Sequence, residues 1–239
     1  MNLALPVQPV VLFDAVGTLI FPSRPVAEYY AQVGKNHGLH VSADALQSRF
    51  EVAFCAQFEP ASTHYHHPCS DLGDNQKWRQ VVKSVFQSDF TESLFDDLWN
   101  LFAKPTTWKL DPRTIPIIDQ LHQLGIIVGV ASNFDSRLNP IIQELIPQIP
   151  ADHIFCSTRI GYSKPDIRFY KSIEKAFEQP MGKRQFLMIG DHWANDVEAA
   201  LRSGWNALWK PDHHFPSLAK ISDHFFRKTK TTSSDVPSI

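Results

Sequence analysis

The stretch Val10–Phe21, VVLFDAVGTLIF, decides the fold. Its apolar first half is typical of a strand that is buried on both faces of a parallel sheet. The run ends in one carboxylate, Asp14, and Gly17-Thr18 then turns the chain. In open α/β sheets ligands bind beyond the carboxyl ends of the strands, so Asp14 stands where chemistry is expected. Position 16, where a second carboxylate would suit proton transfer, holds Val16.

Further apolar runs of the same character follow along the chain. They read GIIVGVASN, HIFCS, QFLMIGD and WNALW. Amphipathic stretches with helical period lie between them, including IPIIDQLHQLG, KPDIRFYKSIEKAFEQP and NDVEAALRSG. Alternation of strands with helices predicts an α/β fold with a Rossmann-like, doubly wound parallel sheet.

Residues 21–104 break this rhythm. SADALQSRFEVAF and QKWRQVVKSVF have helical character, and a polar loop separates them. We therefore expect a helical cap inserted after the first strand. The predicted division is an α/β core of residues 1–20 and 105–239, and a cap of residues 21–104.

Composition narrows the class of protein. The chain has 239 residues, 43% of them hydrophobic, a formal net charge of -2 and three scattered cysteines. Because the chain has no excess of positive charge, we do not expect it to bind nucleic acid. Cysteines in no metal-ligand spacing fit a reducing compartment. No basic start precedes the apolar N-terminal residues, and no apolar stretch reaches the roughly 20 residues that span a bilayer. We expect a soluble cytoplasmic protein that has no membrane partner.

Chemically useful side chains stand at the predicted strand ends. They are Asp14 after the first strand, Ser132 and Asn133 after the second, Lys164 after the third, and Asp191 with Asp196 after the fourth. Each alone has a plain structural reading, such as a turn, a helix cap or a solvated loop lysine. Together, in order, they predict one crevice that contains a nucleophilic carboxylate, a lysine and two further acids.

Four ordered motifs carry a family resemblance. DAVGT, VASN, SKPD and GDHWANDVEAA resemble the motifs of the haloacid dehalogenase (HAD)-like hydrolase superfamily, and the inserted helices resemble the helical cap of its subfamily I. The resemblance covers the whole predicted core. It implies a hydrolase that acts on a small phosphorylated, or halogenated, metabolite.

The resemblance also implies a role for each residue. Asp14 matches the nucleophile and Lys164 the cation that balances its charge. Thr18, Ser132 and the Asn133 backbone amide match substrate-binding positions. Asp14, the Val16 carbonyl, Asp191 and Asp196 match the Mg²⁺ ligands. The physical logic agrees, because Mg²⁺ prefers hard oxygen ligands and a phosphate dianion must be screened from a carboxylate nucleophile.

Val16 departs from the family pattern. Most phosphatases of the superfamily have a second Asp there, which protonates the leaving alkoxide and then activates water. Valine cannot supply this general acid-base help, which is worth on the order of 10²–10⁴-fold. Histidines of the cap are one substitute, namely His64, His66 and His67, with His37 and His40 nearby in sequence, although a solvated loop is the stronger interpretation.

Three functions stay open on the sequence. The first is a Mg²⁺-dependent phosphohydrolase whose activity is slow or restricted. The second is a metal-independent 2-haloacid dehalogenase. The third is a non-catalytic phosphate-binding protein. The sequence leaves the substrate and the oligomeric state undetermined.

Overall fold

The computed structural model describes residues 9–58, 69–177, 186–211 and 215–226. A parallel five-stranded sheet runs through it in the order β5-β4-β1-β6-β7. The strands are β1 (Val10–Phe13), β4 (Ile127–Ser132), β5 (Ile154–Cys156), β6 (Phe186–Gly190) and β7 (Asn206–Trp209). The predicted α/β fold with a doubly wound parallel sheet is confirmed.

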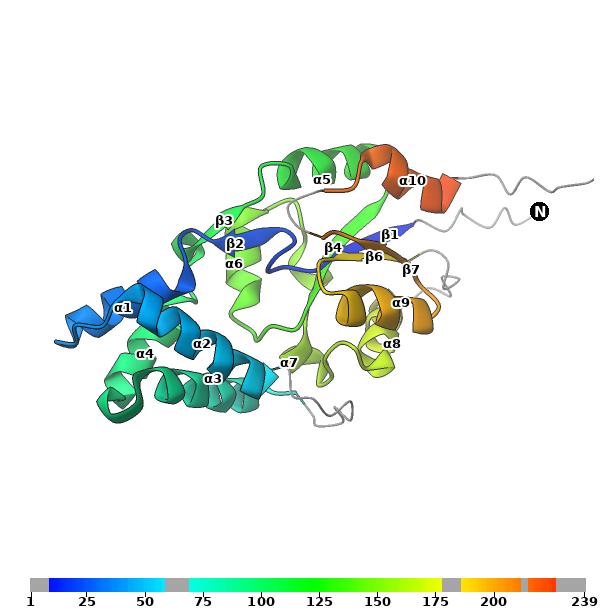
Figure 1. The fold of residues 1–239 in the computed structure, drawn as a ribbon. Helices are drawn as coiled ribbons and strands as arrows, with labels where there is room; N and C mark the ends of the chain where they lie inside the picture. Colours follow the sequence, from blue (N-terminus) through cyan, green and yellow to red (C-terminus); the bar gives the residue numbers. More distant parts are fainter. Residues whose placement is uncertain (1–8, 59–68, 178–185, 212–214, 227–239) are drawn as a thin grey trace, which may run out of the picture.

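Helices cover both faces of this sheet (Figure 1). On one face lie α5 (Thr114–Gln123), α6 (Leu138–Leu145) and α10 (Leu218–Phe226); on the other lie α8 (Ile167–Ala176) and α9 (Ala199–Arg202). Side chains alternate along β1, so that Val11 and Phe13 join the first layer while Val10 and Leu12 join the second. Because β1 is buried on both sides, its sequence is an uninterrupted apolar run.

A second, two-stranded sheet stands at the start of the predicted insertion. β2 (Ile20–Pro22) pairs antiparallel with β3 (Trp108–Leu110), and the Ser23 amide donates to the Thr107 carbonyl at 2.8 Å. This pair was not expected from the sequence. It brings together the points where the chain leaves and re-enters the α/β part.

The helical segment, α1–α4, lies between these two strands. Its helices are α1 (Val26–Asn36), α2 (Ala43–Phe58), α3 (Asp71–Phe86) and α4 (Glu92–Leu101). They gather to one side of the main sheet (Figure 1) and have an apolar cluster of their own. Ser70 and Thr91 cap α3 and α4 through their hydroxyls, as expected of these residue types before a helix.

The loops after β5 and β6 complete the arrangement. A single-turn helix, α7 (Ser157–Ile160), follows β5 and ends at Gly161 with a left-handed φ of 87°. A π-helical segment (Trp193–Glu198) follows β6 and leads into α9. The sequence predicted a helix that starts near Asn195 and Asp196, but it begins at Trp193 because the His192 side chain accepts the Asn195 amide and caps it.

Candidate active site

The ends of β1, β4 and β6 bring the predicted residues to one place. Phe13 of β1 lies level with Val130 of β4 and Ile189 of β6, and the Asp14 amide donates to the Ile189 carbonyl at 2.8 Å. The segments that follow these positions therefore meet at the same edge of the sheet, at the carboxyl ends of the strands. Asp14, Ser132 and Asp196 are all buried there.

Lys164 is the centre of this cluster. Its ammonium group donates to one carboxylate oxygen of Asp14 at 2.6 Å, to one of Asp196 at 2.6 Å and to the Ala131 carbonyl at 2.8 Å. The side chain is only 2% exposed. Burial alone would lower the pKa of Lys164, but Asp14 and Asp196 outweigh it and raise the pKa above its ordinary value. The lysine is a fixed positive charge between two acids.

Asn133 holds the Lys164 loop against the end of β4. Its amide nitrogen donates to the Lys164 carbonyl at 2.8 Å, and its amide oxygen accepts the Lys164 backbone N–H at 2.8 Å. The Asn133 side chain thus satisfies the backbone N–H and C=O of Lys164, which lies outside the strands and has no neighbouring strand to pair with. These two hydrogen bonds fix the position of the Lys164 backbone relative to the end of β4.

Three carboxylates meet beside Lys164. One oxygen from each of Asp14, Asp191 and Asp196 lies within 4.8 Å of the others. Such a set of hard oxygen donors fits Mg²⁺, whose remaining positions are usually water. Burial raises the pKa of Asp14; Lys164 opposes the rise and Asp196 adds to it. Burial and the charge of Asp14 likewise raise the pKa of Asp191, as expected when acids crowd together and a divalent cation would relieve their repulsion.

Glycines make room for two of these acids. A Cβ placed on Gly17, whose φ is +89°, would lie 2.3 Å from an oxygen of Asp191. A Cβ on Gly190 would lie 2.3 Å from the carboxyl carbon of Asp196. The carboxylates of Asp191 and Asp196 therefore occupy the space that a side chain at Gly17 or Gly190 would fill. This explains why glycine stands at both positions.

Two further side chains hold Asp191. The Thr18 hydroxyl, fully buried, donates to an Asp191 carboxylate oxygen at 3.1 Å. The indole of Trp209 donates to the Asp191 carbonyl at 3.0 Å. Thr18, expected to contact substrate, here contacts a carboxylate of the acidic cluster.

Val16 stands at the rim of the same site. It is partly buried, lines the pocket described below and packs against the apolar cluster of the main sheet. A bridge pairs it with Ile20, which closes the turn after Asp14. The side chain offers no proton, as the sequence predicted.

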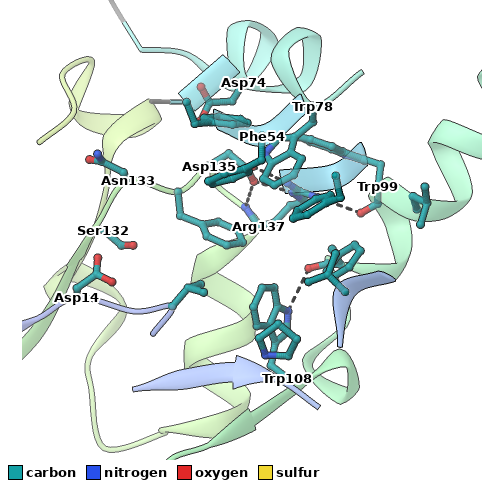
Figure 2. Close-up of a pocket in the computed structure, with 18 of the residues that line it drawn as sticks. Asp14, Phe54, Asp74, Trp78, Trp99, Trp108, Ser132, Asn133, Asp135 and Arg137 are labelled. Atoms are coloured by element: carbon teal, nitrogen blue, oxygen red, sulfur yellow. Dashed lines mark hydrogen bonds and ion pairs between the residues drawn. The ribbon is translucent and has the colours of Figure 1, made fainter. Parts of the chain in front are cut away.

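A pocket of about 420 Å³ opens from the acidic cluster toward the helical segment (Figure 2). At one end lie Asp14, Ser132 and Asn133, and Lys164 also lines the pocket. Toward the other end aromatic side chains dominate: Phe50, Phe54 and Phe58 of α2, Trp78 of α3, Trp99 of α4 and Trp108 of β3. Residues of the α/β part and residues of the helical segment therefore line the same cavity.

Five charged or polar lining residues were not predicted as site residues from the sequence: Asp74, Asp135, Arg137, His192 and Asn195. Arg137 donates to Asp135 at 2.7 Å and to the Trp99 carbonyl at 3.1 Å, which links the loop after β4 to α4. The sequence pattern Asp-x-Arg could have indicated the ion pair between Asp135 and Arg137. The same pattern occurs at residues 111–113 and 166–168, and the arginine donates to the aspartate in both. Burial raises the pKa of Asp74, which Lys77 opposes and Asp135 reinforces.

Other residues considered from the sequence lie elsewhere. His37 contacts Asp97 at 2.8 Å, and His40 is exposed on the segment after α1. Arg79 pairs with Glu92 and stacks over Phe95, so it forms part of the helical segment's own packing. His64, His66 and His67 lie outside the described residues. Trp193 is 54% exposed and packs edge-on against Trp209.

Comparison with known proteins identifies the family. The family model of the haloacid dehalogenase-like hydrolases matches residues 9–204. The chain belongs to that family and is a hydrolase by family membership. It is 26% identical over 203 residues to human haloacid dehalogenase-like hydrolase domain-containing protein 3, covering 82% of this chain and 79% of that protein.

Solved structures share the fold. A defluorinating L-2-haloacid dehalogenase, Rha0230, aligns with a TM-score of 0.68 at 20% identity, covering 87% of this chain and 84% of that one. A HAD phosphatase from Thermococcus onnurineus aligns with a TM-score of 0.60 at 18% identity, covering 88% and 90%. Neighbours of both activities are therefore similar in architecture. Within the described residues, no helix has the length and apolar character that crossing a bilayer requires.

Proposed function

We propose that this chain is a Mg²⁺-dependent phosphohydrolase that uses Asp14 as its nucleophile. The observation that carries the proposal is the position of Lys164, 2.6 Å from both Asp14 and Asp196, beside the third carboxylate, Asp191. One ammonium and three acids at strand ends suit a dianionic phosphate that a divalent cation and a lysine must bring to a carboxylate.

The residues divide the work as follows. Asp14, the Val16 carbonyl, Asp191 and Asp196 would hold Mg²⁺, which when bound screens the phosphate dianion. Ser132 and the Asn133 backbone amide bind phosphoryl oxygens, and Lys164 balances the negative charge near Asp14. We assign Thr18 to positioning Asp191, because its hydroxyl donates to that carboxylate and not into the pocket. Asn133 positions Lys164 through its side chain.

Chemistry then proceeds in two steps. An Asp14 oxygen attacks phosphorus, the bond to the alcohol oxygen breaks and the alkoxide leaves. Water next attacks the phosphorylated Asp14, which releases inorganic phosphate and restores the carboxylate. Val16 supplies neither the proton for the alkoxide nor a base for the water. We therefore expect restricted activity, best on leaving groups that need no proton, such as aryl or acyl phosphates.

We further propose that residues 21–104 are a cap over residues 1–20 and 105–239. The shared pocket and the meeting of the chain at β2 and β3 support this division. A cap that closes would exclude water during the first step. The three scattered cysteines, which have no metal-ligand spacing, suit the reducing cytoplasm as its location.

A substrate panel tests the proposal against its alternative. We would assay aryl, acyl and alkyl phosphates and 2-haloacids with wild type and Asp14→Asn, with and without Mg²⁺. Turnover of phosphates that needs both Mg²⁺ and Asp14 is the expected result. Metal-independent release of halide would instead favour a dehalogenase, although the carboxylate of a haloacid would meet three acids here.

Metal binding is tested separately by calorimetry. Wild type should bind Mg²⁺, and Asp191→Asn should bind it at least about 10-fold more weakly, because a neutral amide replaces a charged ligand. Equal binding by the two proteins would remove Asp191 from the site. Binding of Mg²⁺ and phosphate without any turnover would favour the non-catalytic reading.

A further inference from the structure

The pocket has two chemically different ends. Near Asp14 it is lined by polar groups, among them Ser132, Asn133 and Lys164. Figure 2 shows Phe54, Trp78 and Trp99 at a distance from these, around the part that the helical segment encloses. A bound phosphate ester therefore places its phosphoryl group among polar side chains and its organic group among rings.

The rings are not simply the interior of the helical segment. That interior includes side chains such as Val81, Val85 and Leu94, which are 0% exposed and are not among the residues that line the pocket. Phe50, Phe54, Phe58, Trp78 and Trp99 are instead partly exposed, and all five line the pocket. Phe54 contacts Phe58 and Trp78, with ring centroids 5.0 and 5.8 Å apart. Contacts between Phe50 and Phe54 and between Phe58 and Trp78 extend this into a continuous aromatic wall with one side open to the cavity, and Trp99 lines the same cavity.

Charged groups on this side already have partners. Arg137 is paired with Asp135 at 2.7 Å and lies over the Trp99 ring at 3.3 Å. Asp74 lies 3.7 Å from the Lys77 ammonium. A substrate with many hydroxyls would lose water there and gain few hydrogen bonds, which costs free energy for each unpaired group. An apolar ring would lose no such bonds and would stack on the wall.

From this arrangement we infer that the preferred substrate is a phosphomonoester of an apolar, ring-bearing alcohol and not of a sugar or other polyol. The inference rests on the proposed function, since it names the organic group of the ester that Asp14 would cleave. Hydrolysis consumes one water and yields the ring-bearing alcohol and inorganic phosphate. A cavity of about 420 Å³ is large enough for one aromatic ring system on a short linker.

Binding of uncleavable analogues tests the inference without turnover. We would titrate the full chain, in Mg²⁺, with 3-phenylpropylphosphonate and with propylphosphonate by calorimetry. The two differ only in the ring, so leaving-group chemistry plays no part. The phenyl compound should bind about 10-fold more tightly or better, from the apolar area that it buries. Equal affinity would overturn the inference.

Variants locate the effect. Phe54→Ala and, as a second variant, Trp78→Leu should reduce the preference for the phenyl compound to about threefold or less, since each removes one ring of the wall. Phe90→Ala is the matched control, because Phe90 is a partly buried phenylalanine of the helical segment that is not among the pocket residues. A preference that survives in both pocket variants would overturn the inference.

Turnover separates this inference from the proposed function. The two alkyl esters, 3-phenylpropyl phosphate and propyl phosphate, have similar leaving groups. If wild type hydrolyses both esters with the same KM, the proposed phosphohydrolase activity is supported and the preference for a ring-bearing substrate is contradicted. If the phenyl phosphonate binds selectively but neither these esters nor an aryl phosphate is cleaved, the pocket assignment stands and the phosphohydrolase is contradicted. If neither phosphonate binds, the inference is overturned.

Discussion

At the scale of single residues, the proposed mechanism makes Val16 the residue that limits which phosphates can be cleaved. It lines the pocket beside Asp14, yet its side chain can neither donate nor accept a proton. In the proposed mechanism this slows the loss of a poor leaving group and the attack of water on the phosphorylated Asp14. A single substitution can therefore reveal what the site lacks.

The substitution Val16→Asp should increase turnover of alkyl phosphates by about 10-fold or more, provided that the new carboxylate reaches the leaving oxygen. Turnover of one aryl and one alkyl phosphate would be measured for both proteins. Circular dichroism must first show that the variant folds, because the new charge joins a partly buried position. Wild type that already cleaves both esters equally fast would mean that another group supplies the proton.

Gly17 gives a second residue-scale prediction, about the acidic cluster. Gly17→Ala should weaken Mg²⁺ binding by at least about 10-fold, because its Cβ would lie 2.3 Å from an Asp191 oxygen and displace that ligand. Gly38→Ala is the matched control: Gly38 also has a positive φ, +79°, but a Cβ there meets nothing within 4 Å. Both variants share the left-handed strain of roughly 1–2 kcal/mol. Calorimetry that shows equal Mg²⁺ affinity for both would contradict the seating of Asp191 on Gly17.

At the scale of elements, the loop between β4 and α6 joins the main sheet to the helical segment. Arg137 donates to the carbonyl of Trp99 at the end of α4, and the Ser136 amide donates to Asp71 of α3 at 2.9 Å. Partial burial would raise the pKa of Asp71, but the neighbouring Thr158 hydroxyl and the Ser136 amide outweigh it and lower the pKa below its ordinary value. The loop that follows Ser132 and Asn133 thus also contacts the helices that carry the aromatic end of the pocket.

Arg137→Met should lower the free energy of unfolding by about 3–5 kcal/mol, because it leaves Asp135, 2% exposed, as a buried carboxylate without its partner. Arg168→Met is the control from a second Asp-x-Arg pair. The Arg168 side chain is 41% exposed, so water can replace the lost partner and the effect should be smaller. Urea unfolding measures both. Equal losses would show that Asp135 does not depend on Arg137.

Several elements could be predicted from the sequence because one physical pattern dominates each of them. β1 and β6 are buried on both faces and consist of unbroken apolar runs, and the helices α2 and α3 have polar and apolar residues at helical spacing. β2 and β3 have only three residues each, and β2 contains Pro22. Neither forms an apolar run long enough to be recognised as a strand from the sequence. The early start of the segment at Trp193 depends on the His192 side chain, which spacing alone does not reveal.

The candidate site divides in the same way. Asp14, Ser132, Lys164, Asp191 and Asp196 could be predicted to meet, because parallel strands bring their carboxyl ends to one edge. The aromatic wall could not, although Phe50, Phe54 and Phe58 recur every fourth residue along α2. Such spacing is equally typical of a helix that packs in a core. Only the position of α2 relative to Asp14 distinguishes the two cases.

At the scale of the whole molecule, the chain leaves and re-enters the α/β part at one point. Ser23 and Thr107 are hydrogen bonded, and Pro22 lies opposite Trp108. The described residues between them, 24–58 and 69–106, have an apolar cluster of their own. This arrangement is what an inserted cap requires, and it makes the proposed division testable by excision.

Replacement of residues 24–106 by a short Gly-Ser linker should leave a chain that unfolds cooperatively and still binds Mg²⁺, because Asp14, Asp191 and Asp196 all lie outside the excised part. It should lose the preference for ring-bearing phosphonates, since the aromatic wall is gone. Calorimetry and thermal unfolding measure these properties, and Asp191→Asn in the excised chain is the control for specific metal binding. A chain that cannot fold without residues 24–106 would contradict the division into core and cap.

The most direct measurement of the central claim is the fate of the phosphoryl group. Wild type would be mixed with an aryl phosphate and Mg²⁺, quenched in acid within the first turnover, digested and examined by mass spectrometry. We predict one phosphoryl group on Asp14, absent without Mg²⁺ and absent in Asp14→Asn. Because Val16 cannot activate water, the label should persist longer than in Val16→Asp. Phosphate release by wild type with Asp14 unlabelled at every quench time, or with the label on another residue, would contradict the account.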